Sequence, residues 1–164
     1  MKTLCLFALL FLVPLANAAT KEDLYGTWRL LSFIEQNPAT GRKIRDAYGE
    51  SPRGFLTYGS DGRMWAMIVT ADRPKRKEVS SINDDDRIEL FKTVIAYSGT
   101  YTFDGKKATH NVDISWNETW TGTAQIRNLK LEGPRVTITT DPLRSVVDPK
   151  GEMGVFVLVW EKVK

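Results

Sequence analysis

Residues 24–30 read Leu-Tyr-Gly-Thr-Trp-Arg-Leu and place a Gly-x-Trp motif, Gly26 and Trp28, at the start of the first long strand pattern of the chain. In the residues that follow, up to Gln36, successive side chains fall alternately on two faces, as in a β-strand. The rest of the chain carries short strand patterns separated by Gly- and Asp-rich turns. Such a series is typical of an all-β barrel or sandwich, and the motif at its start favours a small closed barrel.

The turns divide the chain into predicted antiparallel strands. The strongest hairpin signal is Asp61-Gly62, because Asp-Gly supplies the positive φ that a tight turn needs. Asp104-Gly105 and Gly133-Pro134 mark two further turns. The last predicted strand is apolar on both faces, which indicates either burial on both sides or a pairing that closes the sheet. The predicted strands are 24–36, 43–48, 54–58, 63–70, 101–104, 107–116, 121–132, 135–140 and 154–163.

Residues 82–97 have a helical pattern instead. Either Ser81 or Asn83 is a suitable N-cap, and the first turn holds three aspartates, which the helix dipole favours. Gly99 is expected to end the helix. The apolar positions lie on one helical stripe: Ile88, Phe91 and Ile95. We expect one amphipathic helix that lies against or across one end of the barrel.

Residues 1–18 are expected to be a secretory signal peptide. An apolar run from Leu4 to Leu15 is followed by a small-x-small cleavage site that ends at Ala18. The run is shorter than the about 20 apolar residues of a membrane-spanning helix. Cys5, the one cysteine, lies inside the run rather than at the cleavage point, which argues against a lipid anchor. We expect a single domain over residues 19–164, secreted or periplasmic and without a disulfide.

Charge balance and motif content exclude several classes of function. The chain has 23 basic and 20 acidic residues, whereas a nucleic-acid-binding protein gathers a basic excess on one face. After the leader, no apolar run reaches membrane length. Cys-x-x-Cys, His-x-x-x-His, glycine-rich phosphate-loop and Gly-x-Ser-x-Gly motifs do not occur. We therefore predict no metal, no cofactor, no nucleic-acid partner and no membrane span.

Further segments repeat, in order, the pattern of a known family. The chain resembles the bacterial and fungal lipocalin-like domain family over nearly all of residues 19–164. The resemblance implies a closed antiparallel up-and-down β-barrel of about eight strands that holds a small molecule, with Trp28 sealing the closed end. Where lipocalins carry a late arginine against this tryptophan, Lys162 is a partial substitute. The matching segments are Gly26–Trp28, Pro52–Tyr58, Asp61–Met64, Tyr97–Tyr101, His110–Asp113, Trp120–Thr123, Gln125–Arg127 and Trp160–Val163.

His110 is the only histidine, and it shares one strand face with Val112, Ile114 and Trp116. If that face lines the barrel, the imidazole is a polar point in an apolar cavity. It could then hydrogen-bond a ligand, act as an acid or base, or bind a metal. The alternative is a structural histidine bonded to a neighbouring strand. The sequence leaves both interpretations open.

Gln125 and Arg127 share one face of the next predicted strand. An inward arginine could bind a carboxylate through two parallel hydrogen bonds, whereas an ordinary half-exposed strand would turn both side chains to water. The family resemblance places the pair beside His110 and Trp120 and so favours the inward orientation.

Aromatic side chains are candidates for the rest of a ligand-binding wall, with tyrosine hydroxyls to orient the ligand. An eight-stranded barrel can equally be filled by its own side chains. The candidate wall residues are Tyr58, Trp65, Tyr97, Tyr101, Trp116 and Trp160, with Trp120 added by the resemblance.

These observations predict a protein that binds a small, largely apolar molecule with a carboxylate or carbonyl, oriented by His110, Gln125 and Arg127. Two alternatives remain. One is a cofactor-free isomerase, cyclase or dehydratase, which turnover lost in His110→Ala would reveal. The other is an interaction protein with a packed barrel, which a cavity smaller than a few hundred Å³ would favour.

Overall fold

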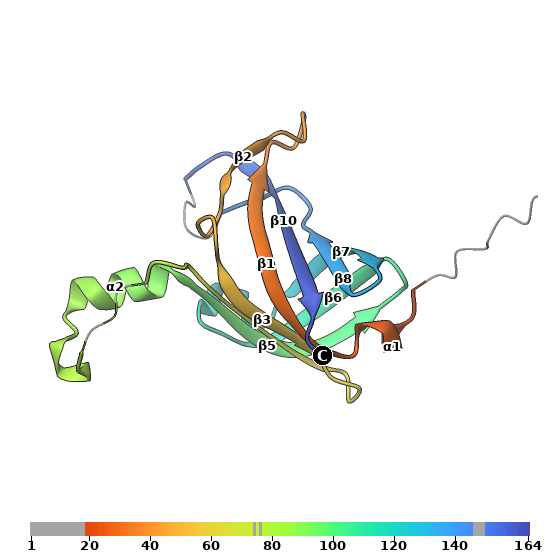
Figure 1. Cartoon of the computed structure of the whole chain (residues 1–164), viewed down its shortest axis with the longest axis horizontal. Coiled ribbons are helices and arrows are strands. Elements are labelled where there is room, and N and C mark those ends of the chain that lie inside the picture. Colours follow the sequence, from red (N-terminus) through yellow and green to blue (C-terminus); the bar gives the residue numbers. More distant parts are fainter. Residues whose placement is uncertain (1–18, 74, 76, 146–149) are drawn as a thin grey trace, which may run out of the picture.

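The computed structural model describes residues 19–73, 75, 77–145 and 150–164. These residues form an antiparallel β-barrel, with one helix standing away from it (Figure 1). The predicted leader, residues 1–18, lies outside the described residues. Within the described ranges, no helix has the length and apolar character needed to cross a membrane.

Ten strands form one sheet in the order β2-β1-β3-β4-β5-β6-β7-β8-β10-β9, and a further pairing of β1 with β10 closes it. β2 and β9 are short additions, so eight long strands make the closed barrel, which confirms the predicted fold. The strand bounds are β1 Gly26–Gln36, β2 Lys43–Asp46, β3 Arg53–Tyr58, β4 Arg63–Val69, β5 Val94–Phe103, β6 Lys107–Ser115, β7 Ala124–Glu132, β8 Arg135–Thr139, β9 Leu143–Arg144 and β10 Met153–Lys162.

The double apolar character of the last strand reflects this closure. β10 pairs with β1 along one edge and with β8 along the other. Phe156, Leu158 and Trp160 point inward and are buried, while the valines between them are half-buried. Of the two predicted explanations, pairing that closes the sheet is therefore the one the structure shows.

The prediction of one helix over residues 82–97 is wrong in its second half. The helix α2 spans Asp84–Lys92, and β5 begins at Val94. Ile95 and Tyr97 are buried on the inner face of β5, which is paired with β4 on one edge and β6 on the other. These two ladders satisfy the backbone polar groups of the segment, so long-range pairing overrides the local helical period.

α2 also does not pack as predicted. Its apolar residues Ile88 and Phe91 are each 52 % exposed, and the helix projects outward from the end of the barrel (Figure 1). Asn83 is the N-cap, because its side chain accepts a hydrogen bond from the Asp86 backbone N–H at 2.9 Å. The other helical segments are short: α1 Lys21–Leu24, η1 Val79–Ser81 and η2 Glu118–Trp120.

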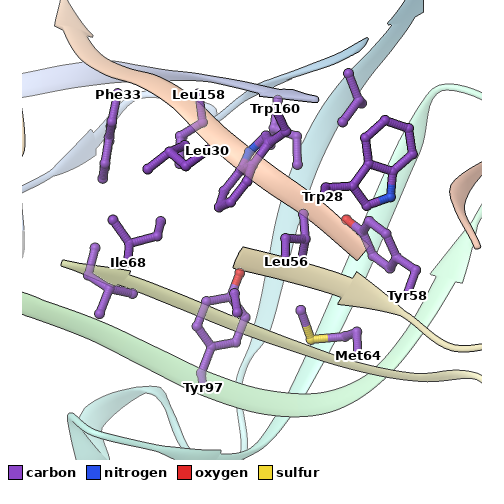
Figure 2. Close-up of a cluster of buried hydrophobic side chains, with 14 of the residues drawn as sticks. Trp28, Leu30, Phe33, Leu56, Tyr58, Met64, Ile68, Tyr97, Leu158 and Trp160 are labelled. Atoms are coloured by element: carbon purple, nitrogen blue, oxygen red, sulfur yellow. The ribbon is translucent and has the colours of Figure 1, made fainter. Parts of the chain in front are cut away.

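Trp28 seals the closed end of the barrel, as the resemblance implied. Its indole Nε1 donates to the carbonyl oxygen of Leu24 at 2.8 Å, and the side chain is 1 % exposed. Lys162 extends over the indole ring, with Nζ 5.2 Å from the ring centroid. Figure 2 shows Trp28 beside Tyr58 and Met64 in the cluster of buried side chains. A hydrogen bond from the Trp28 side chain to the backbone of Leu24 thus holds α1 against this end of the barrel.

Candidate functional site

The barrel encloses a cavity of about 70 Å³. One buried water needs roughly 10–15 Å³ on such a measure, and drug-sized ligands usually occupy about 300–1,000 Å³. The interior is therefore filled mostly by its own side chains and leaves room for a few small groups. Most of the wall is apolar and includes Phe33, Leu56, Ile68, Ile95, Phe156 and Leu158.

One wall of the cavity is polar, and His110 lies at its centre. The imidazole is 1 % exposed. Its Nε2 lies 2.8 Å from the hydroxyl of Tyr58 on β3, and its Nδ1 lies 2.9 Å from the hydroxyl of Tyr97 on β5. Both ring nitrogens are therefore hydrogen-bonded to neighbouring strands, and neither is free to contact a ligand directly.

Burial keeps the imidazole of His110 and the hydroxyl of Tyr58 uncharged. Burial, with a smaller contribution from the positive charge of Arg127, holds the pKa of His110 well below its ordinary value. Burial also raises the pKa of the Tyr58 hydroxyl well above its ordinary value. At neutral pH the imidazole of His110 is consequently neutral, and the hydroxyl of Tyr58 keeps its proton.

Of the predicted pair Gln125 and Arg127, only Arg127 lies in the cavity wall. It comes from β7 and is 8 % exposed. The guanidinium donates to the carbonyl oxygen of the preceding residue, Ile126, at 3.0 Å. It also donates to the side-chain oxygen of Gln125 at 3.5 Å. It also lies over the ring of Trp120, 5.9 Å from the centroid. In the described part of the chain, no carboxylate is within ion-pair distance of Arg127.

Two further wall residues carry polar atoms without a partner. The Tyr48 hydroxyl and the Trp160 indole N–H are buried and make no hydrogen bond within the described residues. Each such atom costs about 1–3 kcal/mol. Burial also raises the pKa of Tyr48, so its hydroxyl remains a donor. Neighbouring side chains cover both atoms, so a ligand would reach them only if the wall moves.

Three of the predicted wall residues lie beside the cavity rather than in its wall. Tyr58 is hydrogen-bonded to His110 but does not line the cavity, and its ring centroid lies 4.7 Å from that of Tyr101. The Tyr101 hydroxyl donates to the Gly59 carbonyl oxygen at 3.0 Å. Trp116 packs edge-on against Trp120 at 5.1 Å. Trp120 and Tyr97 do line the cavity, as does Trp160.

The prediction that Trp65 lines the cavity is wrong, because it lies on the outer face of β4 and is 44 % exposed. The alternation of β4 turns Met64 and Ala66 inward instead. Gln125 is half-buried and donates to the Thr123 hydroxyl at 2.8 Å, outside the cavity wall.

The sequence did not single out Tyr48, which follows the short strand β2 and stacks on Phe33 with a centroid distance of 5.2 Å. No motif marks this residue. Its inward position depends on β2 folding back along β1 through the pairing of Ile34 with Asp46. Only the tertiary arrangement therefore identifies it as part of the wall.

Residues 25–163 match the family described as the lipocalin-like domain. The chain belongs to this family. The match runs through every strand from β1 to β10 and agrees with the resemblance seen in the sequence. No curated protein matches the chain. Because lipocalin-like barrels share a fold without sharing one activity, the function has to be argued from the site.

Proposed function

We propose that this lipocalin-like protein binds a small, largely apolar molecule through a carboxylate or carbonyl group that pairs with Arg127. One observation carries the proposal: a guanidinium that is 8 % exposed has no carboxylate partner in the described part of the chain. Arginine is almost never buried unless it is paired. An anionic ligand group would supply the missing partner.

The rest of the wall fits such a ligand. The apolar residues of β4, β5 and β10 would contact a hydrocarbon part, at about 25 cal/mol per Å² of buried apolar area. The unpartnered Tyr48 hydroxyl and Trp160 N–H would gain acceptors if a ligand parted the wall. A cavity of about 70 Å³ suits a short acyl chain better than a large ring system.

The test is a titration with straight-chain carboxylates from butyrate to decanoate, followed by tryptophan fluorescence, since Trp120 lies against Arg127. We expect saturable binding with an optimal chain length. Arg127→Met keeps the length of the side chain without its charge. It should weaken binding of the best carboxylate on the order of tenfold or more, as expected for a lost charged hydrogen bond.

The same variant separates a binding role from a structural one. If Arg127 is held for a ligand, removal of an unpaired buried charge should leave the free energy of unfolding unchanged or raise it. Arg29→Met is the matched control, because Arg29 is exposed and ion-paired with Glu161 at 2.9 Å. Arg127→Met that binds as wild type and unfolds more easily would assign Arg127 to structure alone and overturn the proposal.

The small cavity also favours a second candidate, an interaction protein with a packed barrel. Phe55, Trp65 and Met67 are each more than two-fifths exposed on the outer faces of the adjacent strands β3 and β4. Apolar patches of this kind mark interaction surfaces. Concentration-dependent association in sedimentation velocity, abolished in Phe55→Ser/Trp65→Ser, with no saturable carboxylate binding, would favour this candidate over the first.

We further propose that residues 1–18 direct the chain to a secreted or periplasmic location and are removed after Ala18. The apolar run and the Ala-Asn-Ala site support this proposal. The mass of the protein purified from its host tests it, since cleavage predicts an N-terminal residue Ala19. An intact N-terminus in protein recovered from outside the cytoplasm would contradict it.

A further inference from the structure

The hydrogen bonds of His110 have a direction that follows from its neighbours. A neutral imidazole has one nitrogen that donates and one that accepts, and each phenol can donate one hydrogen bond. His110 touches one phenol at each nitrogen, Tyr58 at Nε2 and Tyr97 at Nδ1. Only two arrangements are consistent with this geometry, and they differ in which tyrosine keeps a free proton.

In the first arrangement, Tyr58 donates to Nε2 and the Nδ1–H donates to Tyr97. The Tyr97 proton is then free, and Tyr97 lines the cavity, where a ligand oxygen can accept it. In the second, Tyr97 donates to Nδ1 and the Nε2–H donates to Tyr58. The Tyr58 proton is then free in a place that is 1 % exposed and outside the cavity wall.

Within the described residues, neither hydroxyl has another acceptor. The cavity beside Tyr97 has room for a water that can accept its proton, whereas Tyr58 does not border the cavity. The second arrangement therefore leaves a buried O–H proton without a partner, which is strongly unfavourable. The neutral state of the imidazole follows from its burial and from the nearby Arg127 charge, which lower the pKa of His110. On these grounds the first arrangement should predominate on the order of tenfold.

We infer that Tyr58, His110 and Tyr97 form a one-way hydrogen-bond relay that holds Tyr97 as a donor toward the cavity, so that the site selects a ligand group that only accepts hydrogen bonds. The inference about the ligand rests on the proposed function. Tyr58 is a positioning residue in this relay, because it acts through His110 and does not line the cavity.

The donor from Tyr97 and the charge of Arg127 lie on the same wall. Trp120 contacts both, with its ring 5.5 Å from the Tyr97 ring and 5.9 Å from the Arg127 guanidinium carbon. A carboxylate can accept from a phenol and from a guanidinium at the same time. The ligand that suits these two donors is an apolar acid in its ionised form. A ketone oxygen would bind more weakly because it carries no charge, and an amine would be excluded because it would bring a further donor or a positive charge.

Nitrogen-15 NMR of histidine-labelled protein at neutral pH tests the direction of the relay without any ligand. The chain has a single histidine, so the imidazole signals are unambiguous. We expect a protonated Nδ1 and an unprotonated Nε2. A protonated Nε2 with a bare Nδ1, or a charged ring, would overturn the relay.

Tyr58→Phe removes the donor and keeps the ring, so it should turn the single tautomer into a mixture of both. Tyr101→Phe is the matched control. Tyr101 packs against Tyr58 at the closed end, but its hydroxyl donates to the Gly59 carbonyl oxygen and not to His110. The tautomer of the control should equal that of wild type. An unchanged tautomer in Tyr58→Phe would contradict the role of Tyr58.

Titrations with hexanoate and 1-hexanol test the selection. We expect Tyr58→Phe to weaken hexanoate binding about three- to tenfold and to change hexanol binding less, because an alcohol can also donate to Tyr97. If Tyr58→Phe weakens the binding of hexanoate and hexanol equally, the site does not select for groups that only accept hydrogen bonds. Carboxylate binding, and with it the proposed function, would still stand. If wild type binds neither probe, the proposed function and the selection both fail, and the tautomer alone still decides the relay.

Discussion

Lys162 takes the place at the closed end where lipocalins carry an arginine. Its Nζ donates to the Asp23 carbonyl oxygen at 3.1 Å and lies 5.2 Å from the centroid of the Trp28 ring. The sequence departs from the lipocalin pattern here, with Lys162 as a partial substitute, and in the structure the lysine reaches the ring. A lysine at this position supplies a compact charge without the planar stacking surface of a guanidinium.

Lys162→Met should lower the free energy of unfolding by about 1 kcal/mol, because it removes a cation–π contact and a hydrogen bond to a carbonyl. Lys162→Arg should be neutral or stabilising. Urea unfolding followed by tryptophan fluorescence measures both. Lys130→Met, a change at an exposed lysine paired with Glu132, is the control and should have no effect. A stability of Lys162→Met equal to that of the control would contradict a sealing role.

At the scale of the element, β5 shows why a glycine stands in its middle. The register between β5 and β6 shifts between Ser98 and Gly99. A Cβ at Gly99 would overlap the carbonyl oxygen of Asn111 on β6. Glycine in a strand often marks such a close approach of two backbones. The sequence suggested Gly99 as a helix stop, whereas its actual role is to let two strands come together at a bulge.

Gly99→Ala should therefore destabilise the barrel by about 1–3 kcal/mol, since the overlap is with backbone, which cannot rotate away. Thr100→Ser, at the exposed neighbouring position of the same strand, is the control and should change stability by less than about 0.5 kcal/mol. Thermal unfolding followed by circular dichroism checks both. A melting temperature of Gly99→Ala within error of the control would contradict the close approach.

α2 is a short helix whose apolar residues are not buried against the barrel. It is nine residues long, and its apolar residues Ile88 and Phe91 are half exposed. Short helices are marginal without tertiary packing, so its N-cap carries much of its stability. Asn83→Ala should unfold α2 locally, raising hydrogen exchange in residues 84–92, while the exchange of β4 and β5 stays as in wild type. A parallel loss of protection in those strands would show that α2 supports the barrel.

At the scale of the whole molecule, burial of a neutral histidine links folding to pH. Burial, with a smaller contribution from the charge of Arg127, holds the pKa of His110 well below its ordinary value of 6.5. The folded protein keeps the imidazole neutral, while the unfolded chain binds a proton as the pH falls below about 6.5. Acidification therefore favours the unfolded state. The free energy of unfolding keeps decreasing until the pH falls below the lowered pKa of His110 in the folded protein.

We expect the free energy of unfolding to decrease by up to about 1.4 kcal/mol per pH unit between about pH 6 and pH 5. Urea unfolding at several pH values measures this slope. In His110→Gln the slope over this range should disappear, whatever the absolute stability of the variant. The same slope in both proteins would show that other groups cause the pH dependence.

Closure of the barrel decides which of the predicted residues come into contact with one another. The Gly-x-Trp motif and the Asp-Gly turns predicted the strands and hairpins, because turn chemistry and alternation are local properties. The positive φ of Gly62 and Gly105 confirms two of these turns. The inward placement of Arg127 followed from the family resemblance. The contact of Tyr58 with His110 could not be predicted, because it joins residues 52 positions apart in the chain.

The amino-acid sequence by itself determined an all-β barrel of about eight strands, the Trp28 seal and the candidate residues His110, Tyr97, Trp120 and Arg127, since these depend on periodicity, turns and family motifs. The tertiary structure alone decided that residues 94–97 belong to a strand rather than to the helix, that Trp65 faces outward and that the interior leaves a cavity of about 70 Å³. The physical reason is the same in each case: pairing and packing between distant strands override or select among local preferences.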